Sequence, residues 1–341
     1  MRFHPKAGDF FSLVVRGVEI SFRVVPHPDP SFKNLRFPHA MEGERSTVWH
    51  LEANELNQEY ALQVHNARYM RPPCLEQMCA FLDTLKCIEG LASCDRYCLA
   101  PESSGPSIQQ YPELAYSILM PWIEGTSWFD AHQGHESTCR LSRWQCLQLA
   151  LQLASVLSEL EQRGIAHCAL SPNNLIVDLA SGAPRVELLG TEDVFSPALP
   201  ENDRSRNSVP DYRHPAEVLW DSGSDRFPAA ILLSEVLGWY DEKVRAQCDA
   251  ESYFDAAELQ SDDSQRLRLL ADAVSAHHAD LTILLMKAWN SRSPAECPTL
   301  EQWRQGLENV SLTKIEYTWL PAGQPRKSRS STADGKSSRF R

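Results

Sequence analysis

The stretch from His167 to Asp178, HCALSPNNLIVD, holds the residues whose types and order could do chemistry. It carries a histidine and, at Asn174, an amide oxygen of the kind that can ligate Mg²⁺, followed by an apolar run. No Asp or Glu lies between His167 and Val177, and Ala169 stands in the middle of the stretch. One neutral amide oxygen cannot hold Mg²⁺ against water as a carboxylate can. Metal-dependent chemistry here would therefore need an acid from another part of the chain.

The first third of the chain, which precedes this stretch, has the pattern of β-strands. Residues 11–25, FSLVVRGVEISFRVV, cluster β-branched and aromatic residues around Gly17, which is typical of a hairpin. Three more short strands, a helix and a buried strand are expected after it. They span 35–40, 46–53 and 59–65 for the strands, 75–91 for the helix and 115–122 for the buried strand.

The remainder is expected to be mainly helical. Ser142 is a candidate N-cap for a helix with one apolar stripe, and Gly164 marks the end of that helix. Two short strands and a loop rich in Ser, Pro and Asp follow, and then four more helices. These helices are expected at 227–239, 263–277, 280–289 and 299–310. A β-rich half followed by a helical half predicts an α+β fold.

The order of several motifs resembles the protein kinase superfamily, and within it the Ser/Thr kinases, over residues 35–310. HCALSPNN is similar to the family's catalytic loop at His167, Leu170, Pro172 and Asn174, and a long helix precedes it as in the family. ILMPWIEG, which contains Met120, looks like the strand that leads into the hinge between the two lobes.

Further motifs follow in the family's order. The segment 212–217, YRHPAE, looks like the Ala-Pro-Glu motif and ends at Glu217. Asp225 stands at the position that anchors the catalytic-loop backbone, and Gly190 is the part of Asp-Phe-Gly that VELLG keeps. Cys297 replaces the arginine of the family's Arg-Pro-Thr motif. The resemblance implies a bilobal kinase-like fold. Its expected parts are an N-terminal hairpin extension over 1–34, a β-rich lobe over 35–120, a helical lobe over 121–315 and a basic disordered tail over 316–341.

Three charged groups that the family uses for phosphoryl transfer are replaced here. The reaction needs a lysine on the phosphates, an aspartate at the acceptor hydroxyl and an aspartate on the metal. The resemblance places Gln63, Ala169 and Leu188 at those positions. Asn174 is the one metal ligand that remains, and it is not expected to bind a metal alone.

The other nucleotide-binding positions are eroded as well. MEGERSTVWH keeps Gly43 and Val48 of the glycine-rich loop, but Glu44 and its neighbours are too large for close backbone contact with phosphates. In the family, a glutamate on the helix of the β-rich lobe pairs with the phosphate-binding lysine. Glu76 is the nearby acid for this role, whereas the spacing puts Met78 at that position.

A substitute acid is not expected. Glu187 and Asp178 are the candidates, but adjacent strand residues point to opposite faces, so Glu187 should point away if Leu188 faces the cleft. Leu188 and Leu189 together would make the former metal site apolar, which favours a closed or blocked cleft.

The resemblance, with these losses, implies a catalytically inactive pseudokinase that regulates or scaffolds a partner protein. The partner would be a kinase, a phosphatase or a substrate of one. No resident cofactor is expected, and ATP would bind weakly if it binds. The alternatives are an atypical ATP-binding enzyme with residual or altered transfer, with Asn174 and a displaced acid on the metal, and a module that senses nucleotide without metal.

The composition of the chain narrows the classes of protein to which it can belong. The net charge of −12 argues against a surface built for nucleic acid or anionic lipid, and no apolar run reaches the length of a membrane span. Ten scattered cysteines form no Cys-x-x-Cys pair, so a reduced, cytoplasmic protein is expected. Residues 324–341 carry six basic side chains against one acid and have the composition of a disordered tail, for which a solvated terminus is favoured over a docking arm.

Remaining features are expected to be structural. The pair His277–His278 and Cys297 have no third ligand at useful spacing for a metal. Trp122 and Trp128 flank the hinge and could line a pocket or a partner surface, although core packing is the commoner place for tryptophan.

Overall fold

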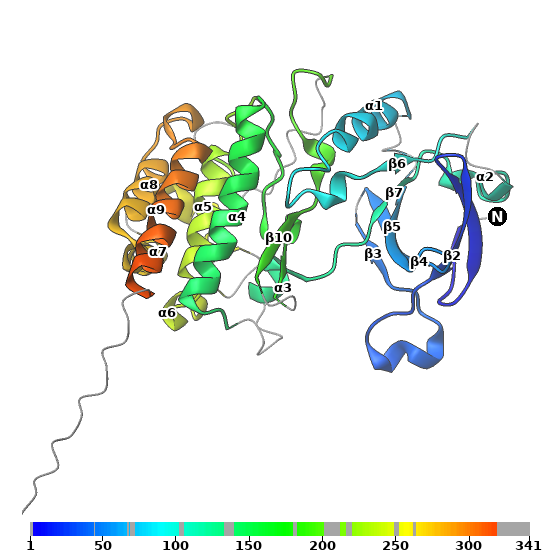
Figure 1. The fold of residues 1–341 in the computed structure, drawn as a ribbon, viewed down its shortest axis with the longest axis horizontal. Helices are drawn as coiled ribbons and strands as arrows, with labels where there is room; N and C mark the ends of the chain where they lie inside the picture. Colours follow the sequence, from blue (N-terminus) through cyan, green and yellow to red (C-terminus); the bar gives the residue numbers. More distant parts are fainter. Residues whose placement is uncertain are drawn as a thin grey trace, which may run out of the picture.

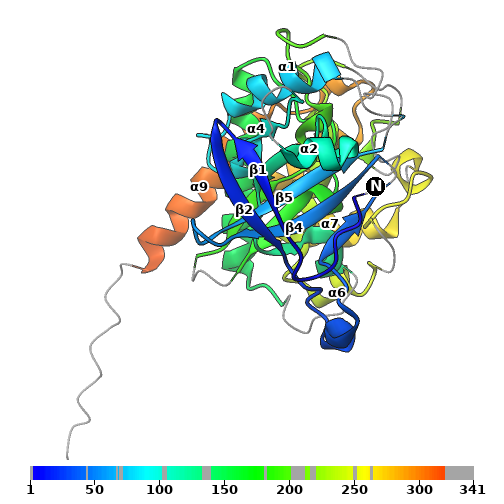
Figure 2. The ribbon, with the colours of Figure 1, turned by 90° about the vertical axis from the view of Figure 1, so that its right-hand side faces the viewer.

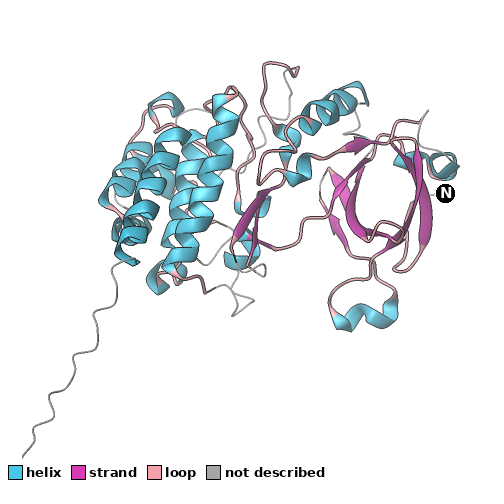
Figure 3. Ribbon diagram, in the orientation of Figure 1, coloured by secondary structure: helices cyan, strands magenta, loops and turns pink. Residues whose placement is uncertain are grey.

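The computed structural model describes most of the chain up to residue 318. The described residues are 3–43, 45–66, 68, 72–101, 106–132, 140–179, 183–200, 212–215, 220–248, 252–261 and 264–318. Glu44, Glu217 and the basic tail at 324–341 lie outside them. The described part combines helices with a curled antiparallel sheet, and Figures 1 and 3 show the strands of this sheet at one end and most helices at the other.

The larger sheet orders its strands β1-β2-β4-β5-β7-β6, with β3 paired to β4. All its pairings are antiparallel. The strands are β1 (Phe10–Val15), β2 (Val18–Val24), β3 (Ala40–Glu42), β4 (Ser46–Ala53), β5 (Gln58–His65), β6 (Tyr97–Cys98) and β7 (Ile118–Pro121). Figure 2 shows how β1 and β2 cross in front of β4 and β5 as the sheet curls.

The predicted hairpin around Gly17 is confirmed. Arg16 and Gly17 both have positive φ, +51° and +81°, and they join Val15 to its partner Val18. A two-residue turn with two positive φ angles matches the twist of the flanking strands. Because β2 also pairs with β4, the hairpin of the segment 1–34 continues the main sheet.

The strand expected at 35–40 is wrong in position. A 3₁₀ helix, Pro30–Leu35, occupies its start, Arg36 has a φ of +52°, and the strand β3 begins only at Ala40. Pro38 lacks the N–H that a ladder needs, which disfavours a regular strand across this stretch.

The helix expected at 75–91 ends early. Helix α1 spans Pro72–Asp83, and the chain then continues in turns whose amides bond three residues back, at Leu85, Ile88 and Leu91. The apolar residues Leu82, Leu85, Ile88 and Leu91 are spaced by three and all are buried. A spacing of three keeps side chains on one face of a 3₁₀-like turn, whereas an α-helix would rotate them away.

The helical part packs on the long helix α4 (Arg143–Gln162). Ser142 caps it as predicted: its Oγ accepts from the Gln145 amide at 3.2 Å, and the Gln145 side chain accepts from the Ser142 amide at 2.9 Å. Gly164 follows its end at a φ of +72°. The other helices are α2 (Pro106–Gln110), α3 (Trp128–His132), α5 (Arg226–Gly238), α6 (Glu242–Arg245), α7 (Gln265–His277), α8 (Ala279–Trp289) and α9 (Leu300–Thr318).

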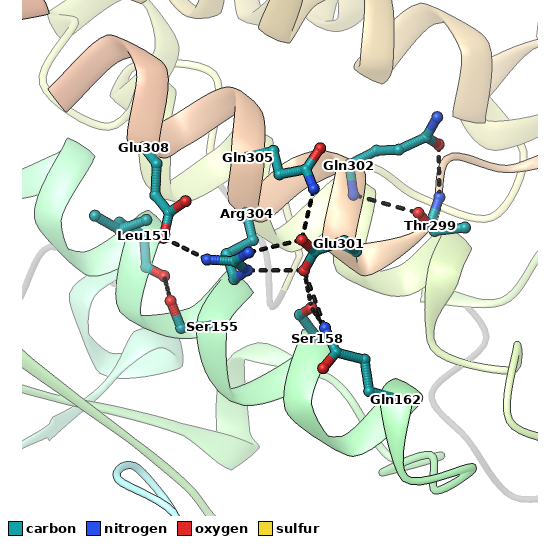
Figure 4. A network of polar contacts seen from close by, with 10 residues as sticks. All are labelled: Leu151, Ser155, Ser158, Gln162, Thr299, Glu301, Gln302, Arg304, Gln305 and Glu308. Atoms are coloured by element: carbon teal, nitrogen blue, oxygen red, sulfur yellow. Dashed lines mark hydrogen bonds and ion pairs between the residues drawn. The ribbon is translucent and has the colours of Figure 1, made fainter. Parts of the chain in front are cut away.

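A polar network joins α4 to α9 (Figure 4). The Glu301 carboxylate accepts from Arg304 Nη2 at 2.6 Å and from Ser158 Oγ at 2.8 Å. Hydrogen bonding to Arg304 and Ser158 lowers the pKa of Glu301 to about 2. Trp303, fully buried on the same helix, makes this interface part of the main core.

A small three-stranded sheet lies between the two ends (Figure 1), with the order β10-β9-β8. Its strands are β8 (Thr126–Ser127), β9 (Leu175–Asp178) and β10 (Arg185–Leu188). No helix in the described part is long and apolar enough to cross a membrane.

Candidate functional site

A cavity of about 910 Å³ lies between the larger sheet and the small sheet. Side chains of β3, β4 and β5 form one wall, the segment from Met120 to Gly125 forms the edge, and residues around β9 and β10 form the floor. The cavity lies within the roughly 300–1,000 Å³ typical of small-molecule sites. The blocked cleft expected from two leucines is therefore not observed.

Several of the residues singled out in the sequence line this cavity. They are Val48, Gln63, Met120, Trp122, Asn174, Leu189 and Gly190. Gly43, His167, Ala169, Leu188 and Asp225 are described residues that stand outside the lining.

Gln63 stands where the resemblance implies the phosphate-binding lysine, and its uncharged amide makes a hydrogen bond within the sheet. It pairs with Val48 across β4 and β5, and its Nε2 donates to Ser46 Oγ at 3.1 Å. Its Oε1 is buried and accepts no hydrogen bond from the described residues. A buried acceptor without a donor costs about 1–3 kcal/mol, which a ligand with an N–H or O–H group at this wall could offset.

Arg96 is the only Lys or Arg among the described residues of the lining, and it is already paired. Its Nη1 lies 2.8 Å from Glu192 Oε1, and its Nε donates to the Ser93 carbonyl at 3.0 Å. Burial alone would raise the pKa of Glu192, but the Arg96 charge outweighs it and lowers that pKa to about 2. This buried ion pair, which sequence reasoning missed, leaves little net positive charge for phosphates.

The loop from residue 167 to 174, here called the His167 loop, is anchored by a buried carboxylate. Asp225, 1% exposed, accepts from the backbone amides of His167 and Cys168, the latter at 2.8 Å. Cys168 has a φ of +60°, and these two bonds fix that backbone. Burial raises the pKa of Asp225 to about 6, so the carboxyl is still ionised at neutral pH.

His167 acts within this loop as a packed hydrogen-bonding residue. Its Nε2 donates to the Leu189 carbonyl at 2.7 Å, and its Nδ1 accepts from the Ala169 amide at 3.3 Å. Burial lowers the pKa of His167 to about 4, which keeps the ring neutral. The imidazole therefore joins the loop to the segment after β10.

Asn174 also bonds within the loop. Its Nδ2 donates to the Ala169 carbonyl at 2.7 Å. Gly190, at a φ of +72°, lies so close that a Cβ there would be 2.5 Å from Asn174 Nδ2. The retained asparagine and glycine thus fit one another as neighbours that shape the cavity floor.

Leu188 does not face the cavity, which corrects the orientation expected for it. It is fully buried in the main core, where its amide donates to the Gly90 carbonyl at 2.9 Å and its carbonyl accepts from Ser93 Oγ at 2.7 Å. Leu188 shares its strand face with buried Val186, and the leucine in the cavity lining is Leu189.

The candidate substitute acids and the candidates for the helix glutamate lie outside the cavity lining. Of the former, Glu187 accepts from the Ala92 amide at 3.0 Å. Of the latter, Glu76 is exposed on α1 and Met78 is buried in the core. None of these residues, nor Asp178, belongs to the described lining. Its acids are Glu124, Asp130 and Glu192.

The edge of the cavity carries a group that sequence reasoning missed, here called the His50 cluster: His39, His50, Glu59, Trp122 and Glu124. The His50 ring stacks on Trp122 with centroids 3.8 Å apart and an interplanar angle of 7°. His50 Nε2 lies 3.0 Å from Glu59 Oε2, and His50 Nδ1 lies 3.0 Å from His39 Nδ1. Burial lowers the pKa of His50 to about 4. Burial and the nearby Glu59 raise the pKa of Glu124.

Two ion pairs connect the sheet side to the segment after β10. Arg45, in the loop between β3 and β4, lies 3.1 Å from Asp193, and Arg96 pairs with the adjacent Glu192. The segment expected to be the glycine-rich loop is thus linked to the segment after β10 by the ion pair of Arg45 with Asp193. At the position of Arg45 the resemblance implies a small residue.

The remaining candidates are structural in the described part. Trp128 is fully buried against Trp239, whereas Trp122 lines the cavity. His277 Nε2 donates to the Leu237 carbonyl at 2.9 Å, and Cys297 is buried. His278 caps α8, where its Nδ1 accepts from the Asp280 amide.

Comparison with protein-family models gives no match, and no curated protein is significantly similar in sequence. The resemblance to kinases therefore rests on the sequence motifs.

Proposed function

We propose that this chain is a bilobal protein kinase-like protein that does not transfer phosphate and instead regulates or scaffolds a partner protein. The observation that carries the proposal is the charge of the cavity. The wall residue where the resemblance implies a phosphate-binding lysine is Gln63, bonded to Ser46, and the one Arg of the described lining is neutralised by Glu192.

The proposed loss of phosphoryl transfer follows from what that reaction requires of a protein. Positioning and charge stabilisation supply nearly all of the catalysis, so a neutral wall removes the main contribution. Ala169 offers no carboxylate to an acceptor hydroxyl, and Asn174 uses its amide nitrogen inside the loop. Of the three acids in the described lining, Glu192 is paired with Arg96 and Asp130 accepts from Ser127 Oγ at 2.6 Å.

The regulatory part of the proposal is supported by how firmly the cavity is built. Asp225 anchors the His167 loop, and two ion pairs, Arg45–Asp193 and Arg96–Glu192, tie the sheet to the segment after β10. A binding body kept in one arrangement can bias a partner by offering better contacts to one of the partner's states. The proposed partner is a kinase, a phosphatase or a substrate of one, met in the cytoplasm.

The alternative is an enzyme or sensor that keeps a nucleotide, and one observation favours retaining it. The cavity of about 910 Å³ is open, and the Gln63 Oε1 acceptor in its wall lacks a donor among the described residues. An adenine or ribose group could supply that donor.

A thermal-shift titration separates these functions. The full chain is heated with ATP alone, with Mg²⁺ or Mn²⁺ alone, and with both. The proposal expects no rise in Tm from ATP beyond that of the metal alone, whereas a ligand at 100 times its Kd would stabilise by about 2.7 kcal/mol. A clear rise that needs both ATP and metal would favour the enzyme. A rise with ATP alone that Gln63→Leu abolishes would favour the sensor.

A further inference from the structure

The register of two strands brings the core of the His50 cluster together. His50 on β4 lies opposite Ala61 on β5, so Glu59, two residues before Ala61, lies diagonally across from His50 on the same face. The Trp122 amide donates to the Glu59 carbonyl at 3.0 Å, which carries the chain past β5 and brings Glu124 to the same place. Ligand atoms of His50, Glu59 and Glu124 all lie within 4.8 Å of one another.

The orientation of the His50 ring is fixed, as is usual for a histidine that coordinates a metal ion. It is 5% exposed, stacked on Trp122, and its Nδ1 is engaged by His39 Nδ1 while its Nε2 points to the carboxylates. A histidine that binds a metal through one ring nitrogen almost always hydrogen-bonds through the other, and this bond sets the tautomer and the ring orientation. His39 already provides such a partner.

We propose that His50, Glu59 and Glu124 form a binding site for a divalent transition-metal ion such as Zn²⁺. One imidazole nitrogen and two carboxylate oxygens are a ligand set that Zn²⁺ accepts, whereas Mg²⁺ and Ca²⁺ are bound mainly through oxygen. Bonds of about 2.0–2.2 Å require the three atoms to draw closer together than 4.8 Å. Glu59 and Glu124 are exposed side chains that can make this adjustment.

The site would keep a coordination position for a ligand in the cavity. His50 and Glu124 both belong to the cavity lining, so an ion held by them would lie at the edge of that space. Three protein ligands with a free position are typical of zinc sites that bind a further molecule. The ion would also join β4 and β5 to the segment from Met120 to Gly125, which leads from the sheet to the helical part (Figure 1).

Titration of the metal-free full chain with Co²⁺ and Zn²⁺, without nucleotide, tests the site. We expect one equivalent of Co²⁺ with an absorption spectrum of nitrogen and oxygen ligands, displaced by Zn²⁺ but not by a large excess of Mg²⁺. Glu124→Gln and His50→Gln should each weaken binding at least about tenfold, and His39→Gln should weaken it by about 10–100-fold through the lost orienting bond.

The control is Glu55→Gln, which removes one exposed carboxylate from the turn between the same two strands and should leave the affinity unchanged. Glu124→Gln changes an exposed side chain, so it remains informative if His50→Gln does not fold. Binding of wild-type strength in Glu124→Gln, displacement by Mg²⁺, or a spectrum of thiolate ligands would overturn the assignment. Because ATP is left out, failure here does not bear on the proposed loss of phosphoryl transfer.

Discussion

The His167 loop and the His50 cluster lie on two sides of the same cavity, and they use their polar groups differently. In the loop, the polar side chains turn inward: Asp225 receives two backbone amides, His167 bonds the Leu189 carbonyl, and Asn174 bonds the Ala169 carbonyl. In the cluster, a fixed imidazole meets two exposed carboxylates whose oxygens can take further bonds. The polar groups of the loop thus hold its own backbone, whereas the proposed capacity to bind a metal lies at the edge of the cavity.

The largest expected effect comes from removing the loop's anchor. Asp225→Ala leaves the buried amides of His167 and Cys168 without an acceptor, and relief of the buried charge offsets only part of this cost. We expect the free energy of unfolding to fall by about 2–4 kcal/mol in urea titrations. Asp272→Ala, on the exposed face of α7, is the matched control and should change it by less than about 0.5 kcal/mol.

On the other side of the cavity, Glu124→Gln should cost little stability in metal-free buffer, because the residue packs little of its surface. If Glu124→Gln destabilised the protein as much as Asp225→Ala, the distinction between a structural loop and a binding edge would fail.

A second comparison uses two glycines with the same φ. Gly190 and Gly164 both have a φ of +72°, but a Cβ at Gly190 would come within 2.5–2.7 Å of the Asn174 amide group, whereas a Cβ at Gly164 would meet nothing within 4 Å. Both alanine variants carry the backbone strain of about 1 kcal/mol, and only Gly190→Ala adds the clash.

Gly190→Ala should therefore lose about 1–2 kcal/mol more than Gly164→Ala. The double variant Gly190→Ala/Asn174→Ala tests the cause, since the shorter side chain at 174 should return part of the loss. Equal effects of the two glycine substitutions would mean that Asn174 can move away freely, and the loop would then be less rigid than described.

The loop could be anticipated from the sequence because the resemblance to kinases implies the positions of its members. His167 and Asn174 follow in one motif, whereas Asp225, at the start of the apolar helix α5, lies 58 residues beyond His167. The sequence predicts both Leu188 and Leu189 at the cavity, and of the two only Leu189 belongs to the lining. The alternation of buried Val186 and Leu188 with Arg185 and Glu187 already placed Leu188 on the core face.

The His50 cluster could not be anticipated in the same way. Alternation puts Val48 and His50 on one face of β4, but which glutamate lies diagonally opposite depends on the register. That register is set by the four-residue turn between Ala53 and Gln58, with Asn57 at a φ of +50°. Glu124 belongs to a third segment, far along the chain, so only the assembled sheet brings His50, Glu59 and Glu124 together.

The smallest predicted effect concerns pH and His167. The folded-state pKa of about 4 lies below the usual value of 6.5, so the unfolded chain takes up a proton first as the pH falls. The stability that the neutral ring contributes is complete above pH 6.5 and is lost as the pH falls from 6.5 towards 4. Protonation would place a hydrogen on Nδ1, which now accepts from the Ala169 amide, so the charged ring would oppose the loop's own hydrogen bond.

Between pH 7 and pH 5 this group should lower the free energy of unfolding by about 1–2 kcal/mol. Asp225 and Glu235, whose pKa values burial raises to about 6 and about 8, oppose this trend, so the measurement must be a difference between variants. His167→Gln, compared with the wild type by urea titration at both pH values without metal, removes only the histidine contribution. The wild type should lose more stability than the variant over this interval. A parallel loss in both proteins would show that the His167 ring is not held neutral, and its bond to the Leu189 carbonyl would no longer explain how the loop is fixed.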